Sequence, residues 1–227
     1  MKPPSAVDHL MADCALYLIT PPQIELEVFL PQLDAALAAA PGAGVEIACL
    51  QLRLKDVLDA EVLAAAKAIK PVLAAHGAAL IINDSAELAK RAGADGVHLG
   101  QADGSVKAAR ALLGDDADIG VTCHDSRHLA MIAAEQGADY VAFGAFFPTS
   151  TKETAHRPDP EILTAWSMMT TMPCVAIGGI TPQNANPLIE AGADYLAVSA
   201  GIWAHPGGPA KAVEEFGEIL RAVGGGA

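Results

Sequence analysis

Eight short apolar runs recur along the 227-residue chain, and longer stretches of helical character separate them. The runs are continuous rather than alternating in polarity, as is typical of parallel strands covered on both faces. They occupy residues 15–20, 45–53, 78–84, 96–100, 118–122, 140–145, 174–179 and 195–200. Strand and helix that alternate eight times predict an α/β fold, a single-domain (β/α)8 TIM barrel. A doubly wound open sheet is the alternative.

A repeated motif supports this succession. Three segments share a helix end, a glycine, an Ala-Asp pair and then a strand: 92–100, 136–144 and 191–199. The glycine suits the left-handed residue that commonly ends a helix. Between strands, residues 57–77 have helical periodicity. Residues 181–192 predict another helix, with Thr181 as N-cap and Pro182 at its first position.

Composition limits the kind of protein and partner. Hydrophobic residues make up 52% of the chain, enough for one large barrel over 15–223, between an N-terminal extension (1–14) and a flexible tail (224–227). No apolar run has the length of a transmembrane helix, and the N-terminus lacks the apolar core of a secretory signal, so we expect a cytoplasmic protein. A formal net charge of −13 argues against nucleic acid or an anionic membrane as partner. The oligomeric state, including a homodimer, stays open.

The cysteines indicate no disulfide framework. They are scattered and form no C-x-x-C pair: Cys14, Cys49, Cys123 and Cys174. We expect reduced thiols at or near strands.

Polar residues gather where the strands end, which is the active-site face of such a barrel. Gln51, Arg53 and Lys55 alternate at the end of the second run, so that a strand would turn them to one side. A buried cation needs an anionic partner. With Lys152 after the sixth run, these cations suit a diphosphate. The alternative is a structural network with nearby aspartates (Asp56, Asp59 and Asp84).

Two carboxylates follow neighbouring strands. Asp84 ends the third run, and Asp103 lies three residues after the fourth. Mg²⁺ favours one or two carboxylates together with phosphates and water, whereas Zn²⁺ would favour Cys or His. The sequence therefore predicts a magnesium site. The alternative is that each aspartate only caps the helix that follows it.

A second anion site is predicted at the last two strands. Gly178 and Gly179 allow backbone N–H groups to approach a phosphate, and Ser199 offers a hydroxyl. A tight turn that merely requires glycine is the alternative.

In this order, the motifs resemble those of the thiamine-phosphate synthase family over about residues 15–203. The segment QLRLKD resembles its Gln-x-Arg-x-Lys stretch, and the segment from Ile82 to Asp103 resembles its Asn-Asp and Gly-Gln-x-Asp elements. FPTSTK resembles its Pro-Thr-x-Thr-Lys loop, while AIGGIT and AVSAGI resemble its last two strands. The chain departs from the family pattern at YLITPP, at Thr122, where Ser is common, and at 153–160, which does not map.

The resemblance implies the coupling of 4-amino-2-methyl-5-hydroxymethylpyrimidine diphosphate to a thiazole phosphate, with release of diphosphate. It implies Mg²⁺ at Asp84 and Asp103. The residues implied to hold the pyrimidine diphosphate are Gln51, Arg53, Lys55, Asn83, Thr122 and Lys152. Those implied for the thiazole phosphate are Thr149, Ser150, Thr151, Gly179, Val198 and Ser199, with Gly178 shaping the turn.

The implied chemistry is a dissociative substitution. Diphosphate leaves a benzylic-type carbon, the aminopyrimidine stabilises the cation, and the thiazole nitrogen attacks. No protein nucleophile is required, so the catalytic residues are expected to be Arg53, Lys55, Lys152 and Thr122, which neutralise and position charge. Residues 146–159 are predicted to form a mobile lid that excludes water.

Two other functions remain as alternatives. A thiazole tautomerase, a related barrel, would use His124 as acid and base. It would not need the cations at the second and sixth runs. A non-catalytic binder of thiamine precursors could keep the phosphate site and lose the metal carboxylates, yet both are present.

Overall fold

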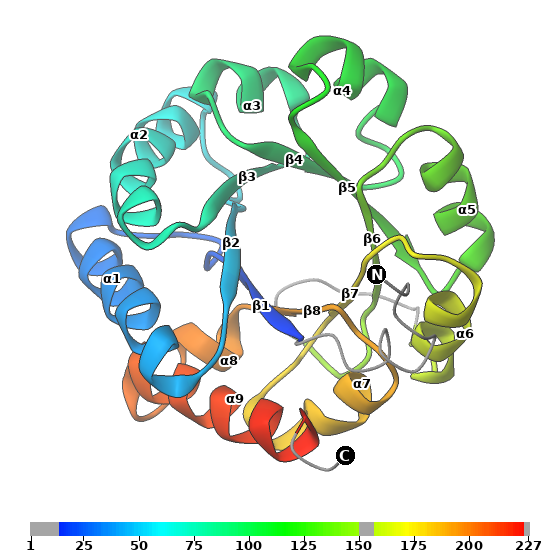
Figure 1. The fold of residues 1–227 in the computed structure, drawn as a ribbon. Helices are drawn as coiled ribbons and strands as arrows, with labels where there is room; N and C mark the ends of the chain where they lie inside the picture. Colours follow the sequence, from blue (N-terminus) through cyan, green and yellow to red (C-terminus); the bar gives the residue numbers. More distant parts are fainter. Residues whose placement is uncertain (1–13, 150–156, 225–227) are drawn as a thin grey trace, which may run out of the picture.

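The eight apolar runs form eight parallel strands that close into one barrel (Figure 1). The computed structural model describes residues 14–149 and 157–224. Each strand pairs with the next in the chain, and β1 pairs with β8. The strands are β1 Ala15–Ile19, β2 Ile47–Leu52, β3 Ala79–Asn83, β4 Gly96–Leu99, β5 Asp118–His124, β6 Tyr140–Gly144, β7 Cys174–Ile177 and β8 Tyr195–Val198. The TIM-barrel prediction is confirmed, and the open sheet is excluded.

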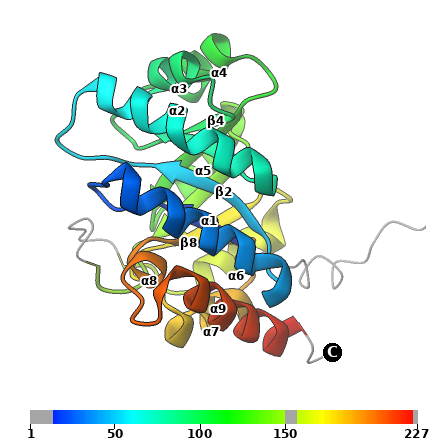
Figure 2. The ribbon, with the colours of Figure 1, turned by 90° about the vertical axis from the view of Figure 1, so that its left-hand side faces the viewer.

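Helices surround the barrel on its outside (Figure 1). They are α1 Leu26–Ala43, α2 Asp59–His76, α3 Ala86–Ala92, α4 Val106–Leu113, α5 Arg127–Glu135, α6 Glu161–Met169, η2 Pro182–Asn184, α7 Asn186–Glu190, α8 Ala200–Trp203 and α9 Gly208–Gly224. The last helix, α9, packs along α1, so the two ends of the described barrel lie side by side (Figure 2).

The helix predicted at 181–192 is divided in two. Thr181 precedes a single 3-10 turn, η2, and α7 begins only at Asn186. Pro187 explains the break, because proline has no N–H and its ring collides with the carbonyl four residues earlier. It fits instead into the first turn of α7, where no donor is missed.

The core has two parts. The larger lies between strands and helices and includes Leu33, Ile69, Trp166 and Phe216, all fully buried. The smaller fills the barrel interior with Tyr17, Ile19, Cys49, Ile81, Tyr140, Ala142, Val175 and Ala197. The side chains of successive strand residues thus alternate between these two environments.

The Gly-Ala-Asp repeat has a structural purpose. In each copy the aspartate precedes a strand and accepts a hydrogen bond from a backbone N–H of the strand before it. The distance from the backbone nitrogen to the aspartate Oδ2 is 2.7 Å from Leu80 to Asp95, 2.7 Å from Ile119 to Asp139 and 2.8 Å from Cys174 to Asp194. These carboxylates therefore join β3 to β4, β5 to β6 and β7 to β8 at the amino ends of the strands.

All four cysteines are buried free thiols, as expected for a reduced protein. Burial is the largest cause that raises their pKa, and it brings the pKa of Cys123 to about 12. Across residues 14–149 and 157–224, no helix combines the length and apolar character needed to cross a membrane. The predicted extension (1–14) and tail (224–227) fall almost wholly outside the described residues and stay predictions.

Candidate active site

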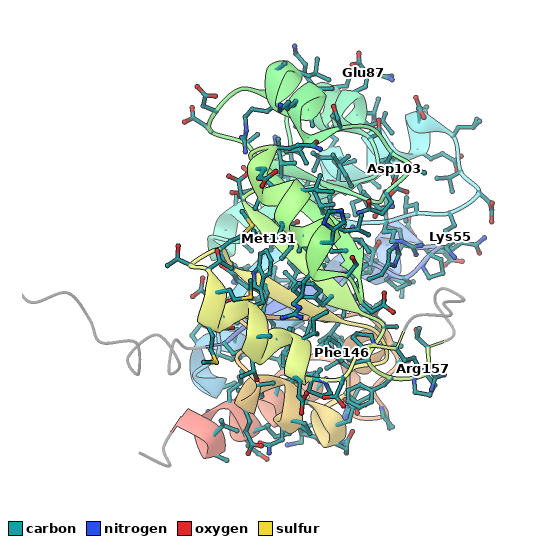
Figure 3. The ribbon with its side chains drawn as sticks, turned by 90° about the vertical axis from the view of Figure 1, so that its right-hand side faces the viewer. Lys55, Glu87, Asp103, Met131, Phe146 and Arg157 are labelled. Atoms are coloured by element: carbon teal, nitrogen blue, oxygen red, sulfur yellow. The ribbon has the colours of Figure 1, made fainter. Side chains whose placement is uncertain are left out.

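The predicted site residues that the structure describes lie at or just after the carboxyl ends of the strands. We call this end of the barrel the mouth. Figure 3 shows Lys55 and Asp103 at this same end, together with Arg157. Thr149 is the last residue described before a gap. Ser150, Thr151 and Lys152 lie outside the described residues, so their predicted roles stay predictions.

The end of β2 meets the ends of β1 and β3. Gln51 is buried and donates through Nε2 to Asn83 Oδ1 at 2.6 Å. The backbone N–H of Arg53 donates to Thr20 Oγ1 at 2.9 Å. Because that N–H bonds to a side chain rather than to the sheet, the strand stops at Leu52, and Arg53 and Lys55 follow it in a loop. The second strand is therefore shorter than predicted, and strand geometry does not fix the direction of these two side chains, so their common side stays a prediction.

Thr20 is a residue of the mouth that the sequence analysis missed. Its backbone carbonyl accepts a hydrogen bond from Ser199 Oγ at 3.3 Å, while its hydroxyl holds the backbone of Arg53. Thr20 is buried and follows β1 directly. A polar residue at the end of an apolar run was the available signal, and it links β1, β2 and β8.

The structural alternative receives little support at Arg53. Asp59, one of the aspartates considered as a partner, pairs with Arg91 at 3.3 Å. Within the described part of the chain, Arg53 forms no ion pair, and its side chain is half-buried. A half-buried guanidinium at a barrel mouth suits an anionic ligand.

Neither metal-site aspartate caps a helix. Ser85 caps α3 through a 3.1 Å bond from Leu88 N–H, and Ser105 caps α4 through a 3.2 Å bond from Ala108 N–H. Asp84 and Asp103 are both exposed. Asp103 Oδ2 accepts the backbone N–H of Gly100 at 2.9 Å, which orients this carboxylate after β4. Two exposed carboxylates after adjacent strands are an oxygen donor set that fits Mg²⁺.

Among the described residues, three that are not glycine adopt left-handed backbone conformations, and all three lie at the mouth. Asp56 has φ 56°, Asp84 φ 66° and His124 φ 54°. Such conformations are uncommon outside glycine and cluster at functional sites. Each occurs where the chain leaves β2, β3 or β5, so the backbone bends sharply at the positions that present the predicted site residues.

Thr122 lies in β5 with its hydroxyl 2.8 Å from His98 Nε2. Its backbone carbonyl accepts Gln101 Nε2 at 2.6 Å. The pairing of β5 with β6 shifts between Thr122 and His124, and β5 continues to His124, two residues beyond its predicted end at 122. His98 is buried in the barrel interior.

Gly178 and Gly179 pack directly against the segment that follows β6. A Cβ atom on Gly178 would lie 2.3 Å from Ala145 Cβ, and one on Gly179 would lie 2.3 Å from the Pro148 carbonyl oxygen. Phe147 N–H also donates to Gly178 O at 3.0 Å. The tight-turn alternative thus accounts for both glycines, and their predicted contact with a phosphate stays a prediction.

The same contacts limit the predicted lid. Phe146 is buried and donates its backbone N–H to Ile177 O at 3.1 Å, so the first residues of 146–159 are held on β7. A movable segment would begin after Phe147. Residues 150–156 lie outside the described part of the chain, and the lid stays a prediction.

The comparison with known families decides the assignment. The family model for thiamine monophosphate synthase matches residues 16–202, which is nearly the whole barrel. The chain belongs to the thiamine monophosphate synthase family. The resemblance found in the motifs is therefore confirmed.

Relatives within the thiamine monophosphate synthase family are close. The thiamine-phosphate synthase of Rhodospirillum centenum is 56% identical over 211 residues, which cover 93% of this chain and 100% of the relative. That of Hyphomonas neptunium is 50% identical over 213 residues, covering 92% and 94%. A solved thiamine phosphate pyrophosphorylase from Pyrococcus furiosus is 27% identical with a TM-score of 0.78, covering 94% of this chain and 98% of that one.

Proposed function

We propose that the chain is a thiamine-phosphate synthase that joins the pyrimidine diphosphate to a thiazole phosphate and releases diphosphate. One observation carries this: Gln51 and Asn83 are hydrogen-bonded at the mouth of a family barrel, where Asp84 and Asp103 follow the two adjacent strands. These groups come from the ends of β2, β3 and β4. They match the recognition of a diphosphate ester with a divalent metal.

The diphosphate group is the centre of the proposed chemistry. The C–O bond of the pyrimidine diphosphate breaks, and its electron pair leaves with diphosphate. The thiazole nitrogen then donates its lone pair to the same carbon, so no external acid or oxidant is consumed. Arg53, Lys55 and Lys152 neutralise the leaving group, a preorganised electrostatic contribution. The Gln51–Asn83 pair orients the pyrimidine, and Thr122 donates a hydrogen bond.

Mg²⁺ would be held by Asp84 and Asp103. When bound, it supplies positive charge to the diphosphate oxygens. The Asp103 carboxylate is already oriented by Gly100 N–H, so part of the site is formed by the chain itself.

The thiazole phosphate is proposed to lie on the other side of the mouth. Its phosphate would meet the ends of β7 and β8 at Gly179 and Ser199, with Val198 at the base and Thr149, Ser150 and Thr151 from the loop after β6. Holding the two substrates side by side would favour attack by the thiazole nitrogen, because it replaces a bimolecular encounter.

The decisive assay mixes both substrates with and without Mg²⁺ and measures diphosphate and thiamine phosphate. Production of both in equal amounts, dependent on Mg²⁺, is the expected result. Isomerisation of a thiazole carboxylate phosphate without coupling would favour the tautomerase that uses His124. Binding of both substrates without turnover would favour the non-catalytic binder. A cytoplasmic location and a homodimer stay predictions, the latter for sedimentation to test.

A further inference from the structure

A chain of hydrogen bonds runs from the barrel interior to the mouth. Tyr17 OH and Tyr140 OH are 3.0 Å apart, Tyr140 OH and His98 Nδ1 are 3.2 Å apart, and His98 Nε2 and Thr122 Oγ1 are 2.8 Å apart. The first three side chains are buried, and Thr122 is half-buried. These hydrogen bonds therefore connect a closed interior to a residue of the proposed substrate site.

The geometry around Tyr140 holds these hydrogen bonds in place. The Tyr140 ring is stacked on the His98 ring, with centroids 5.6 Å apart and planes inclined by 29°. It lies across β5 at Gly120, where a Cβ atom would be 2.0 Å from Tyr140 Cζ. The absence of a side chain at Gly120 thus gives the tyrosine its position beside His98.

The buried end sets the direction of the hydrogen bonds. Among the described residues, the Tyr140 hydroxyl is the only hydrogen-bond partner of the Tyr17 hydroxyl. A buried hydroxyl that fails to donate keeps the full cost of its desolvation, so the Tyr17 hydroxyl donates to Tyr140. The Tyr140 hydroxyl must then donate to His98 Nδ1. With Nδ1 acting as acceptor, the proton of the imidazole is on Nε2.

We propose that Tyr140 and His98 are positioning residues that hold the Thr122 hydroxyl as a hydrogen-bond donor toward the bound pyrimidine diphosphate. His98 Nε2–H donates to Thr122 Oγ1, so the hydroxyl proton of Thr122 points away from the imidazole. Without this constraint, Thr122 could donate to His98 and present only lone pairs to an anionic substrate. The proposal rests on the proposed function, because it assigns Thr122 a substrate oxygen as acceptor.

The test compares two identical changes in the same interior cluster. Tyr140→Phe removes the hydroxyl that donates to His98. Tyr17→Phe removes an equal hydroxyl but leaves Tyr140 free to donate to His98. We expect Tyr140→Phe to lower kcat by roughly 3- to 10-fold, the worth of one hydrogen bond. Tyr17→Phe should stay within about twofold of the unchanged protein, on the same scale.

A double-variant cycle identifies the route of the effect. In a Thr122→Val background, Tyr140→Phe should lower kcat no further, because the hydroxyl it orients is gone. An equal loss in both backgrounds, or equal effects of the two tyrosine changes, would overturn the proposal. Melting temperatures of all variants separate loss of folded protein from loss of positioning.

Nitrogen-15 NMR of the unliganded protein gives a readout independent of turnover. His98, assigned by the signal lost in His98→Gln, should show the Nε2–H tautomer, and Tyr140→Phe should introduce the Nδ1–H form. An Nδ1–H tautomer in the unchanged protein would refute the direction of the hydrogen bonds. If the coupling assay failed while the Nε2–H tautomer was seen, the proposed function alone would fall, because the hydrogen-bond direction would stand.

Discussion

Single residues at the mouth hold the backbone in conformations that most side chains avoid. Asp84 has a φ of 66°. Asp and Asn adopt this left-handed conformation more readily than most other residues with a Cβ atom. Its identity therefore serves both the backbone bend and the proposed metal site. Substitution by Asn separates these two requirements, because Asn keeps the bend and loses the charge.

Asp84→Asn should lower kcat by roughly 100-fold, as expected for the loss of one preorganised electrostatic partner. The concentration of Mg²⁺ needed for half-maximal activity should also rise. Asp115→Asn, an exposed carboxylate in the loop after α4, serves as the control with both quantities unchanged. Steady-state kinetics at several Mg²⁺ concentrations would decide, and an unaltered Mg²⁺ dependence would argue against a metal at Asp84.

Gly179 combines a left-handed φ of 65° with close contact to Pro148 O. Gly179→Ala should cost about 1–3 kcal/mol of stability through strain and should raise KM for the thiazole phosphate by displacing the segment after β6. Gly77→Ala is the matched control, because Gly77, at the end of α2, has a φ of 74° and a Cβ atom added there would meet nothing within 4 Å. An equal change of KM in both variants would show that strain alone is responsible.

The sequence predicts helices and strands correctly where hydrophobicity determines them. It misplaces their ends where a single local contact determines them. The apolar runs predict all eight strands. The second strand ends before Arg53 because the Arg53 N–H bonds to Thr20, and the helix predicted at 181–192 is interrupted before Asn186 because of Pro187. The spacing along the chain cannot predict that Tyr140 reaches His98, since this contact between β6 and β4 crosses β5 at Gly120. The site motifs were visible because they end strands, as Thr20 does, whereas Tyr140 acquires meaning only from register.

The aspartates of the Gly-Ala-Asp repeat join pairs of strands, and substitutions at Asp194 test how much such a bond contributes to stability. Asp194→Ala leaves the Cys174 N–H without its 2.8 Å partner and should destabilise the fold by about 1–3 kcal/mol. Asp194→Asn should recover most of this, since its amide oxygen can accept the same bond. Denaturant unfolding measures the difference. kcat should be unchanged in both variants, because the bond lies at the end of the barrel opposite the mouth, and a drop in kcat without lost stability would contradict this.

At the scale of the whole molecule, all three tyrosines share an environment that opposes ionisation. Burial is the largest cause that raises the pKa of Tyr17 and of Tyr140 well above the ordinary 10.0, and the pKa of Tyr195 is raised for the same first reason. In each, the folded state favours the protonated phenol.

The consequence for stability has a definite sign. Below pH 10 both the folded and unfolded states carry protonated tyrosines, so this contribution is constant. As the pH rises through 10, the unfolded state loses phenolic protons that the folded state keeps, and the free energy of unfolding falls. Alkaline titration should show little tyrosinate absorbance until the protein unfolds. Normal ionisation of two or more tyrosines in the folded protein would contradict the buried placement of Tyr17 and Tyr140.

The carboxylate links between β3 and β4, β5 and β6, and β7 and β8 also suggest where the polypeptide tolerates being cut and rejoined. A circular permutant with its new termini in the loop between α4 and β5 leaves each aspartate close in sequence to the strand whose N–H it accepts. New termini between α3 and Asp95 would place Asp95 at the opposite end of the chain from β3. The first permutant should fold more readily than the second, so the family barrel is best treated as an assembly of two-strand modules.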